Sequence, residues 1–355
     1  MDEFDDTMGE PDAEADGTLT PGWDAISAAL DSLYPGVEPR HYGTLIRFRL
    51  GGRDPLDGLS AYKRLEPVPH WHIVSYGLSE LYEKESDDSE ISGYGFELTF
   101  RLACDPAEEE PPMWALNFLQ NLARYVFETG NVFHVGDWMP TNGPISSDHE
   151  TALHAVAFAA DPELPAINTP FGQVEFRQVV GLTDDELRAA RLWQTSSLLQ
   201  AFRPHLPLLV TDLARGSMLA DPALARAVAE GSARDGSSTG YLLTDRLDWT
   251  VRRRVLGATG YQITLGAGQV EELAGLLPLR VPFERGLRLV DDGGTSVVFA
   301  PGVRDEVVEE DGALVLQLTP ASARALAEAL RPMTGSYAVP GLPAVTLLVE
   351  DRHGV

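Results

Sequence analysis

The sequence predicts an α+β fold that is divided into two domains. Its 355 residues exceed the usual size of a single domain. Alternating strand-like stretches and long helical stretches fill the first two thirds, and shorter strands with one helix fill the rest. A small, polar stretch at 229–240 separates the two patterns. We therefore predict a disordered acidic tail at 1–20, an N-terminal lobe at 21–235, a linker at 236–248 and a smaller C-terminal α+β lobe at 249–355.

The elements of the N-terminal lobe follow from hydrophobic periodicity. Trp23, Ile26 and Leu30 recur at helical spacing until Pro35-Gly36 ends the helix. A second helix is expected at 113–129. A third is expected at 183–202, where Thr183 and Glu186 form a capping box. Strands are expected at 41–52, 70–78, 93–102, 151–161, 171–182 and 206–213.

The strand GYGFELTFRL at 93–102 has two chemically different faces. Glu97, Thr99 and Arg101 alternate with an aromatic row that includes Phe96 and Phe100. Alternation of this kind is typical of a strand with one buried face and one solvated face. We expect the polar row to be exposed and to have a structural rather than a functional role.

The helix at 113–129 carries aromatic residues outside its main apolar stripe. Leu116, Leu119 and other apolar residues form that stripe, whereas Trp114, Phe118 and Tyr125 lie on another side. Such a helix is either buried between layers or presents one face to a partner. Burial is the more common explanation, because exposed aromatic patches are rare.

The C-terminal lobe is predicted from a switch to short strands. A hairpin spans 287–301 and turns at Asp291–Gly294. Thr319 caps a helix that has Pro320 in its first turn. Further strands are expected at 261–268, 313–318 and 344–350.

Charge and composition restrict the possible partners. The formal net charge is −27, and residues 1–20 contribute eight acidic side chains and no basic one. Nucleic acid and anionic membranes would be repelled, whereas a basic protein would be attracted. No apolar run approaches about 20 residues, and the N-terminus does not read as a signal peptide. With Cys104 as the single cysteine, we expect a cytoplasmic protein without disulfides.

Motifs for catalysis or cofactor binding are weak. The sequence has no G-x-S-x-G elbow and no phosphate-binding G-K-[ST]. The acidic surroundings of Cys104 would raise its pKa, which disfavours a nucleophilic thiol. We therefore predict no enzyme and no cofactor. One alternative stays open: His70 and His72 form an H-x-H pair that could bind zinc or iron in a metal-dependent enzyme, if a third ligand joined them. A structural strand entry explains the pair equally well.

Several long blocks resemble the Suppressor of fused family. They are HWHIVSYGLSELY (70–82), SGYGFELTFRL (92–102), LARYVFETGNVFHVGD (122–137), TPFGQVEFRQVVGLTDDEL (169–187) and LLVTDLARG (208–216). The resemblance implies two α/β-type lobes with mixed sheets, joined by a hinge, that grip an extended peptide added as a strand. In the C-terminal part, LPLRVPFERGLRL (277–289) is similar to an arginine-containing strand pair of the family's second lobe.

The resemblance also implies partner-binding residues. By position in the matching motifs these are Tyr125, Asp137, Asp161 and Phe171. The family resemblance indicates a non-catalytic protein-binding module, and for a bacterial member a toxin-neutralising immunity protein. A regulator or scaffold that holds a peptide of a cellular factor is the alternative. The expected partner is a protein, such as a basic toxin domain or an extended peptide.

Overall fold

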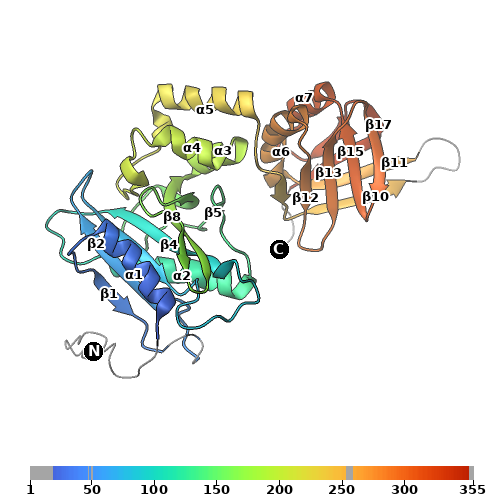
Figure 1. Cartoon of the computed structure of the whole chain (residues 1–355). Helices are drawn as coiled ribbons and strands as arrows, with labels where there is room; N and C mark the ends of the chain where they lie inside the picture. The colour runs from blue at the N-terminus through green and yellow to red at the C-terminus, as the bar shows by residue number, and fades with distance from the viewer. Residues whose placement is uncertain (1–18, 47, 49–50, 253–258, 352–355) are drawn as a thin grey trace, which may run out of the picture. The chain divides into compact units, whose positions relative to one another are not determined.

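The computed structural model describes residues 19–46, 48, 51–252 and 259–351, and the chain divides into two compact units. Unit 1 comprises residues 1–187 and 202–218, and unit 2 comprises residues 188–201 and 219–355. Figure 1 shows that each unit contains both helices and sheets, which confirms the predicted α+β class. Residues 1–18 of the predicted acidic tail lie outside the described residues. The predicted domain and linker boundaries stay a prediction.

Unit 1 is built on one mixed sheet of eight strands. The order is β1-β2-β3-β4-β8-β6-β5, and β7 pairs with β8 beside this path. Only the central pair, β4 and β8, is parallel, and all other neighbours are antiparallel. The strands are β1 (Arg40–Gly43), β2 (Gly58–Arg64), β3 (His70–Tyr76), β4 (Ile91–Ala103), β5 (Trp138–Pro140), β6 (Leu153–Ala160), β7 (Ile167–Thr169) and β8 (Gly172–Thr183).

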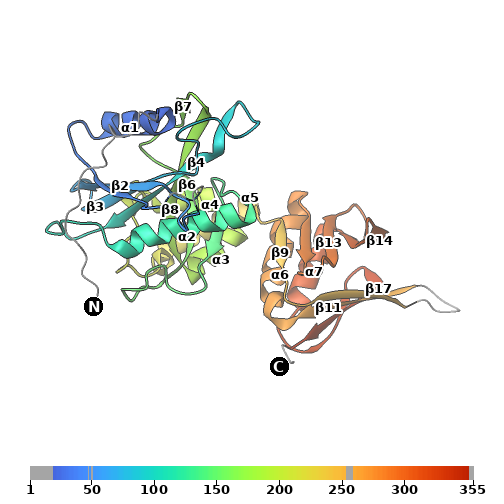
Figure 2. The ribbon, with the colours of Figure 1, turned by 90° about the horizontal axis from the view of Figure 1, so that it is seen from below.

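Two helices cover opposite faces of this sheet, as Figure 2 shows for α1 (Pro21–Leu33) and α2 (Met113–Thr129). Leu116, Leu119 and Val126 of α2 pack into a core with β2, β3 and β4. Ile26 and Leu30 of α1 form a separate cluster on the other face, together with Val74 and neighbouring side chains. The sheet is therefore the middle layer of three, and neither face of β4 is solvated.

The predicted solvent exposure of the polar row on β4 is wrong. Glu97, Thr99 and Arg101 are fully buried, because α1 and the segments around it cover their face of the sheet. Glu97 accepts hydrogen bonds from Ser75 Oγ and Ser79 Oγ, both at 2.6 Å, and from the backbone N–H groups of residues 77 and 79. The alternation reflects a polar interior layer rather than a water-facing one.

Other expectations for the predicted N-terminal lobe are confirmed or corrected in detail. The helix at 183–202 starts as predicted, and Glu186 Oε2 accepts from Thr183 N at 3.0 Å, but it is two helices, α3 (Asp184–Leu192) and α4 (Thr195–Phe202). The strand expected at 206–213 is wrong, because residues 207–209 form the 3-10 helix η2 (Pro207–Leu209) and only an isolated bridge joins Thr211 to β4. The strand expected at 41–52 ends at Gly43, and its residues 47, 49 and 50 lie outside the described residues.

Unit 2 contains two sheets around a common apolar core. One sheet has the order β10-β11-β17-β16, and the other has the order β14-β15-β13-β12-β9. The strands are β9 (Tyr241–Leu243), β10 (Leu247–Arg252), β11 (Gly260–Gly266), β12 (Leu287–Val290), β13 (Ser296–Pro301), β14 (Glu306–Glu310), β15 (Ala313–Leu318), β16 (Gly335–Val339) and β17 (Leu342–Glu350). The remaining helices are η3 (Met218–Ala220), α5 (Pro222–Asp235), α6 (Ala267–Arg280), η4 (Val281–Phe283) and α7 (Pro320–Ala329).

The hairpin at 287–301 and the Thr319-capped helix are confirmed. Two helices of unit 2 were not predicted. Residues 229–235 are the last turns of α5 rather than a loop, and residues 277–280 of the expected strand pair belong to α6. The following stretch is also held in place, since Arg280 Nη1 donates to the carbonyl of Ser237 at 2.8 Å and Ser237 is fully buried. The interpretation of residues 229–240 as a linker or exposed loop is therefore wrong for 229–235, which are helical, and for the buried Ser237.

Candidate functional site

The end of α2 and the loop that follows it place Tyr125 and Asp137 close together. Gly130 ends α2 in the left-handed conformation, with φ of 72°, which glycine adopts at little cost. The chain then returns to the sheet, where Gly136 N donates to Phe158 O at 2.8 Å and Phe158 N donates to Asp137 O at 2.9 Å. Asp137 therefore lies directly before β5, anchored to β6.

Aromatic stacking fixes the position of Tyr125. Its ring stacks on Phe133 with centroids 5.4 Å apart and an interplanar angle of 15°, and Phe133 stacks on Phe158 at 4.1 Å and 9°. The guanidinium of Arg177 on β8 donates to the carbonyl of Phe133 and so ties the loop that follows α2 to the sheet. Tyr125 is 37% exposed, and it is the exposed end of a stack rooted in the core.

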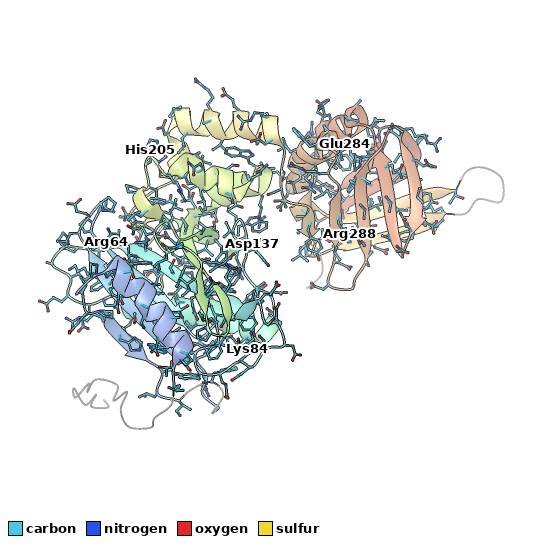
Figure 3. The ribbon with its side chains drawn as sticks, viewed as in Figure 1. Arg64, Lys84, Asp137, His205, Glu284 and Arg288 are labelled. Carbon is cyan, nitrogen blue, oxygen red and sulfur yellow. The ribbon has the colours of Figure 1, made fainter. Side chains whose placement is uncertain are left out.

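Asp137 combines a local structural contact with an accessible oxygen. Its Oδ2 accepts from His134 N at 2.7 Å and lies 3.5 Å from His134 Nδ1. Within the described part of the chain, Oδ1 has no hydrogen-bond partner, and the side chain is 48% exposed. Figure 3 shows Asp137 in the part of unit 1 where Figure 1 labels β5, whereas Arg64 lies on the other side of unit 1 in the same view. One carboxylate oxygen therefore keeps the loop in shape, and the other is left unpaired among the described residues.

β5 is the outer strand at one end of the eight-stranded sheet. Met139 pairs with Val156, and Thr141 N donates to His154 O at 3.0 Å. In an antiparallel ladder, successive residues point their backbone polar groups alternately to one side and the other. The backbone groups of Trp138 and the carbonyl of Pro140 therefore point away from β6. Proline at this position is typical of an edge strand, since it has no N–H to give a second neighbour.

Asp161, by contrast, lies inside the molecule. Its side chain has no exposed area and accepts from His72 Nε2 at 3.1 Å, Thr99 Oγ1 at 2.8 Å and Arg101 Nη2 at 3.0 Å. Backbone N–H groups of residues 163 and 164 complete the shell. Burial by itself would raise the pKa of Asp161, but the His72 hydrogen bond and the charge of Arg101 outweigh it and hold that pKa well below its usual range. In this conformation Asp161 stabilises the fold and offers no surface to a partner.

The two histidines of the H-x-H pair belong to the same buried network. His72 Nδ1 is 2.6 Å from Tyr34 Oη, and His70 Nδ1 is 2.7 Å from Val68 O. His70 Nε2 lies 3.3 Å from Arg101 Nη1, which leaves it the role of an acceptor. Burial, followed by the charge of Arg101, lowers the pKa of His70 to about 4.

These contacts disfavour the alternative in which His70 and His72 bind a metal ion. Both rings are committed to protein hydrogen bonds, and a metal ion at His70 would face the guanidinium of Arg101. Among the residues that the structure describes, no three His, Cys, Asp or Glu side chains form a metal-binding group. The geometry gives the pair a structural role at the start of β3.

Phe171 lies at the turn between β7 and β8, away from Tyr125 and Asp137. Its carbonyl accepts from Lys84 Nζ at 2.8 Å, and its N–H donates to Thr169 Oγ1 at 3.1 Å. Arg177 lies six positions further along the chain, which corresponds to roughly 20 Å of strand. The structure thus brings together Tyr125 and Asp137, and places Asp161 and Phe171 elsewhere in unit 1.

Similarity to known proteins shows the family to which this chain belongs. The Suppressor of fused protein family model matches residues 52–216. Suppressor of fused homologs of Mus musculus and Homo sapiens are each 37% identical over 234 residues, covering 61% of this chain and 48% of theirs. A chain in the crystal structure of the Sufu–Fu complex is 34% identical, with 98% of it and 59% of this chain covered, at a TM-score of 0.55. The chain belongs to the Suppressor of fused family.

The fold agrees with this membership beyond the matched segment. The crystal structure of Drosophila Suppressor of Fused superimposes with a TM-score of 0.82 over 94% of this chain and 98% of that one, at 23% identity. The chain spans about half the length of the curated Suppressor of fused relatives that it matches. In the part that the structure describes, no helix has the length and apolarity needed to cross a membrane. The predicted resemblance and fold class are both confirmed.

Sequence reasoning missed a surface feature of unit 2. The strand β9 is the outer strand of the five-stranded sheet, and it exposes Tyr241 and Leu243. At the opposite end of that sheet, β14 carries Glu306, Glu309 and Glu310, charges that protect an edge from pairing. The three-residue stretch YLL was too short to show a strand period, so only the sheet order reveals it as an apolar edge.

Proposed function

We propose that this Suppressor of fused protein is a non-catalytic binding module that takes up an extended segment of another protein along β5. The observation that carries the proposal is the outer strand β5, flanked by the exposed Tyr125 and by Asp137. An added strand gains affinity from main-chain hydrogen bonds and selectivity from neighbouring side chains. Tyr125 supplies a rigid aromatic surface, and Asp137 supplies a charge.

The two ends of the eight-stranded sheet differ in a way that favours β5. The opposite edge, β1, carries the charged Arg40, and a charged residue on an edge discourages pairing. β5 consists of Trp138, Met139 and Pro140, which bear no charge. Pro140 limits the length over which a second strand can pair. The edge therefore suits a short segment rather than a second sheet.

Charge supports a basic partner. The chain has a formal net charge of −27, which accelerates encounters with a cationic protein. At the proposed site, the free oxygen of Asp137 can accept a charge-assisted hydrogen bond from an arginine, lysine or protonated histidine. A hydrogen bond to a charged group contributes about 1.5–3 kcal/mol, equivalent to a roughly 10- to 100-fold change in affinity.

The relatives support protein binding as the general activity, since one of them was crystallised in the Sufu–Fu complex. For the biological setting, we propose neutralisation of a basic toxin domain by a cytoplasmic immunity protein. Retention of a cellular regulatory factor is the alternative within the same binding mode. Co-expression separates the two: an immunity protein restores growth of cells that produce its toxin, and a regulator has no such effect.

The binding mode can be tested by selecting a random dodecapeptide phage library on the wild-type chain and measuring the enriched peptides by calorimetry. We expect Asp137→Arg to weaken binding about 10- to 100-fold. Asp105→Arg is the matched control, because Asp105 is also an exposed unit 1 aspartate whose carboxylate accepts a nearby backbone N–H. Equal affinity of wild type and Asp137→Arg for every enriched peptide would refute the proposed site.

A further inference from the structure

A cavity of about 630 Å³ opens on the side of the unit 1 sheet that α2 covers. It is lined by the loop that follows β3, the start of β4, the end of α2 and the segment before β2. We call it the aromatic pocket, because Phe48, Tyr94 and Phe127 are among its lining residues. Its volume lies within the usual range of about 300–1,000 Å³ for sites that bind one small molecule.

Phe127 is the middle ring of the aromatic wall. Its centroid lies 5.0 Å from that of Phe48 at an interplanar angle of 71°, and 5.1 Å from that of Tyr94 at 64°. Phe48 is exposed and the other two residues are partly buried, so all three side chains keep accessible surface. The faces of aromatic rings carry partial negative charge, and rings set at steep angles around one space form the cages that bind quaternary ammonium groups.

Asp57 adds a carboxylate to this wall. Leu59 and Ala61, at the alternate positions that follow it, belong to the core under α2, so strand alternation directs Asp57 to the same side of the sheet. Its side chain is partly buried, and within the described part of the chain it has no hydrogen-bond or ion-pair partner. A partly buried carboxylate without a partner favours a cationic ligand.

The described side chains around the pocket supply no positive charge to it. None of the described residues that line it is basic. Lys84 belongs to the loop after β3, but its Nζ donates to Glu80 Oε2 at 2.9 Å. The same ammonium donates to the carbonyls of Ile91 and Phe171 at 2.7 and 2.8 Å. An anionic ligand would therefore find no counter-charge in the pocket.

Two buried carboxylates hold the loop wall of the pocket in shape. Glu97 accepts from the backbone N–H groups of Gly77 and Ser79, both at 2.9 Å. Glu80 accepts from Ser86 N at 2.6 Å. Contacts within the protein thus fix this wall, and a ligand does not have to order it, which favours affinity.

We propose that the aromatic pocket binds the alkylated ammonium group of a small organic cation. The rings of Phe48, Tyr94 and Phe127 contact the alkyl groups around the nitrogen, and Asp57 pairs with the positive charge. A neutral apolar ligand would leave this carboxylate unpaired, whereas an alkylated ammonium group satisfies both the rings and the acid. The inference does not depend on strand addition, because the described residues that line the pocket include none of β5.

Choline and 3,3-dimethyl-1-butanol test the charge, because they have the same shape and differ only in the central atom, a cationic nitrogen or a neutral carbon. Their methyl protons give single NMR signals that broaden on binding to the full chain. At about 0.15 M NaCl we expect saturable binding of choline, and binding of the neutral alcohol that is about tenfold weaker. No saturable binding of choline, or equal affinities for the two probes, would overturn the inference.

A pair of matched variants locates the cation. Phe127→Leu removes the middle ring and should weaken choline binding about tenfold. Phe118→Leu is the control, because Phe118 is also a partly buried residue of α2 packed on the same core, but it does not line the pocket. Both variants keep the net charge, so unspecific attraction to the acidic chain is the same in each. Equal affinities of the two variants for choline would overturn the site.

Asp57→Asn keeps the test decisive if Phe127→Leu fails to fold. The substitution retains the size of the side chain and removes its charge. We expect choline to bind about tenfold more weakly, and the neutral alcohol to bind as it does to wild type. An unchanged affinity for choline would contradict the proposed pairing with Asp57.

A third probe separates a free small molecule from a methylated side chain of a partner protein, which offers the same chemistry. We expect N-acetyl-trimethyllysine methylamide to bind no more tightly than choline. Binding about tenfold tighter than choline would overturn the assignment to a small molecule.

Discussion

Asp161 and Asp137 were both predicted as partner-binding residues, and the structure gives them opposite properties. We expect Asp161→Ala to destabilise the protein strongly. The side chains of Arg101 and His72 have no exposed area. Removing the carboxylate therefore leaves both of them buried without this hydrogen-bond acceptor. Glu163 still lies 3.0 Å from Arg101 Nη1, but it is on the partly exposed side of the network. Breaking a buried charge pair from one side typically costs about 3–5 kcal/mol.

Asp137→Ala should behave differently. The variant loses one hydrogen bond from His134 N at a half-exposed position, which contributes about 0.5–1.5 kcal/mol. The two variants therefore separate stability from recognition: Asp161→Ala lowers the free energy of unfolding, and Asp137→Ala mainly lowers affinity for selected peptides.

Urea unfolding followed by tryptophan fluorescence measures this difference. With a slope of about 1–3 kcal/mol per molar urea, a loss of about 3–5 kcal/mol moves the midpoint of Asp161→Ala by roughly 1–5 M. At the same slope, the midpoint of Asp137→Ala should move by no more than about half as much, since its expected loss is about 0.5–1.5 kcal/mol. A midpoint for Asp161→Ala within experimental error of wild type would refute the buried network as a source of stability.

Three further predictions follow from particular contacts. Gly22→Ala should cost about 1–3 kcal/mol, since a Cβ there would lie 2.0 Å from Glu80 O, whereas Gly216→Ala has open space and should be neutral in thermal unfolding. His70 has a folded-state pKa of about 4, below its ordinary value, so the unfolded chain binds a proton first and stability is lost as pH falls from about 6.5 to 4. His70→Gln should flatten that loss in urea midpoints measured across this range, and an unchanged pH profile would contradict the assignment. The association rate of a basic selected peptide should fall about tenfold between 0.05 and 0.5 M NaCl in stopped-flow measurements, and a salt-independent rate would exclude steering by the net charge of −27.

The elements with long, regular periods were predictable from sequence. The helix α2 and the strands β3, β4 and β8 have the predicted type because their apolar residues repeat at helical or alternating spacing. The helix α6 was missed although Val270, Leu273 and Leu277 recur at helical spacing, because residues 277–289 were assigned to a strand pair by resemblance. The helix α5 was missed because its alanines and short polar residues resemble a linker.

The burial of the β4 polar row could not be read from that strand alone. Alternation of polar and apolar residues gives the same pattern whether water or a buried hydrogen-bond network faces the polar side. The distinguishing information lies in distant segments, namely the donors Ser75 and Ser79 that surround Glu97 and the acid Asp161 that meets Arg101. Two amphipathic helices flanking one set of strands, α1 and α2, were the available signal that both faces would be covered.

The candidate site was partly predictable. Motif position and the second aromatic face of α2 both led to Tyr125. Its ring stacks on Phe133, and Asp137 is hydrogen-bonded to the next residue of that loop, His134. Asp161 and Phe171 were assigned by motif position only, which carries no information about burial. The edge position of β5 depends on the sheet order, which no local pattern encodes.

Strand addition along β5 is tested most directly by an N-methyl scan of the best selected peptide. Methylating one backbone nitrogen at a time removes one N–H donor and leaves the side chains unchanged. Since only every second residue of an added strand directs its N–H toward its neighbour, we predict that affinity losses of about tenfold alternate with unchanged affinities along the peptide. Uniform tolerance of methylation, or losses without a two-residue period, would contradict strand addition and require a different binding mode.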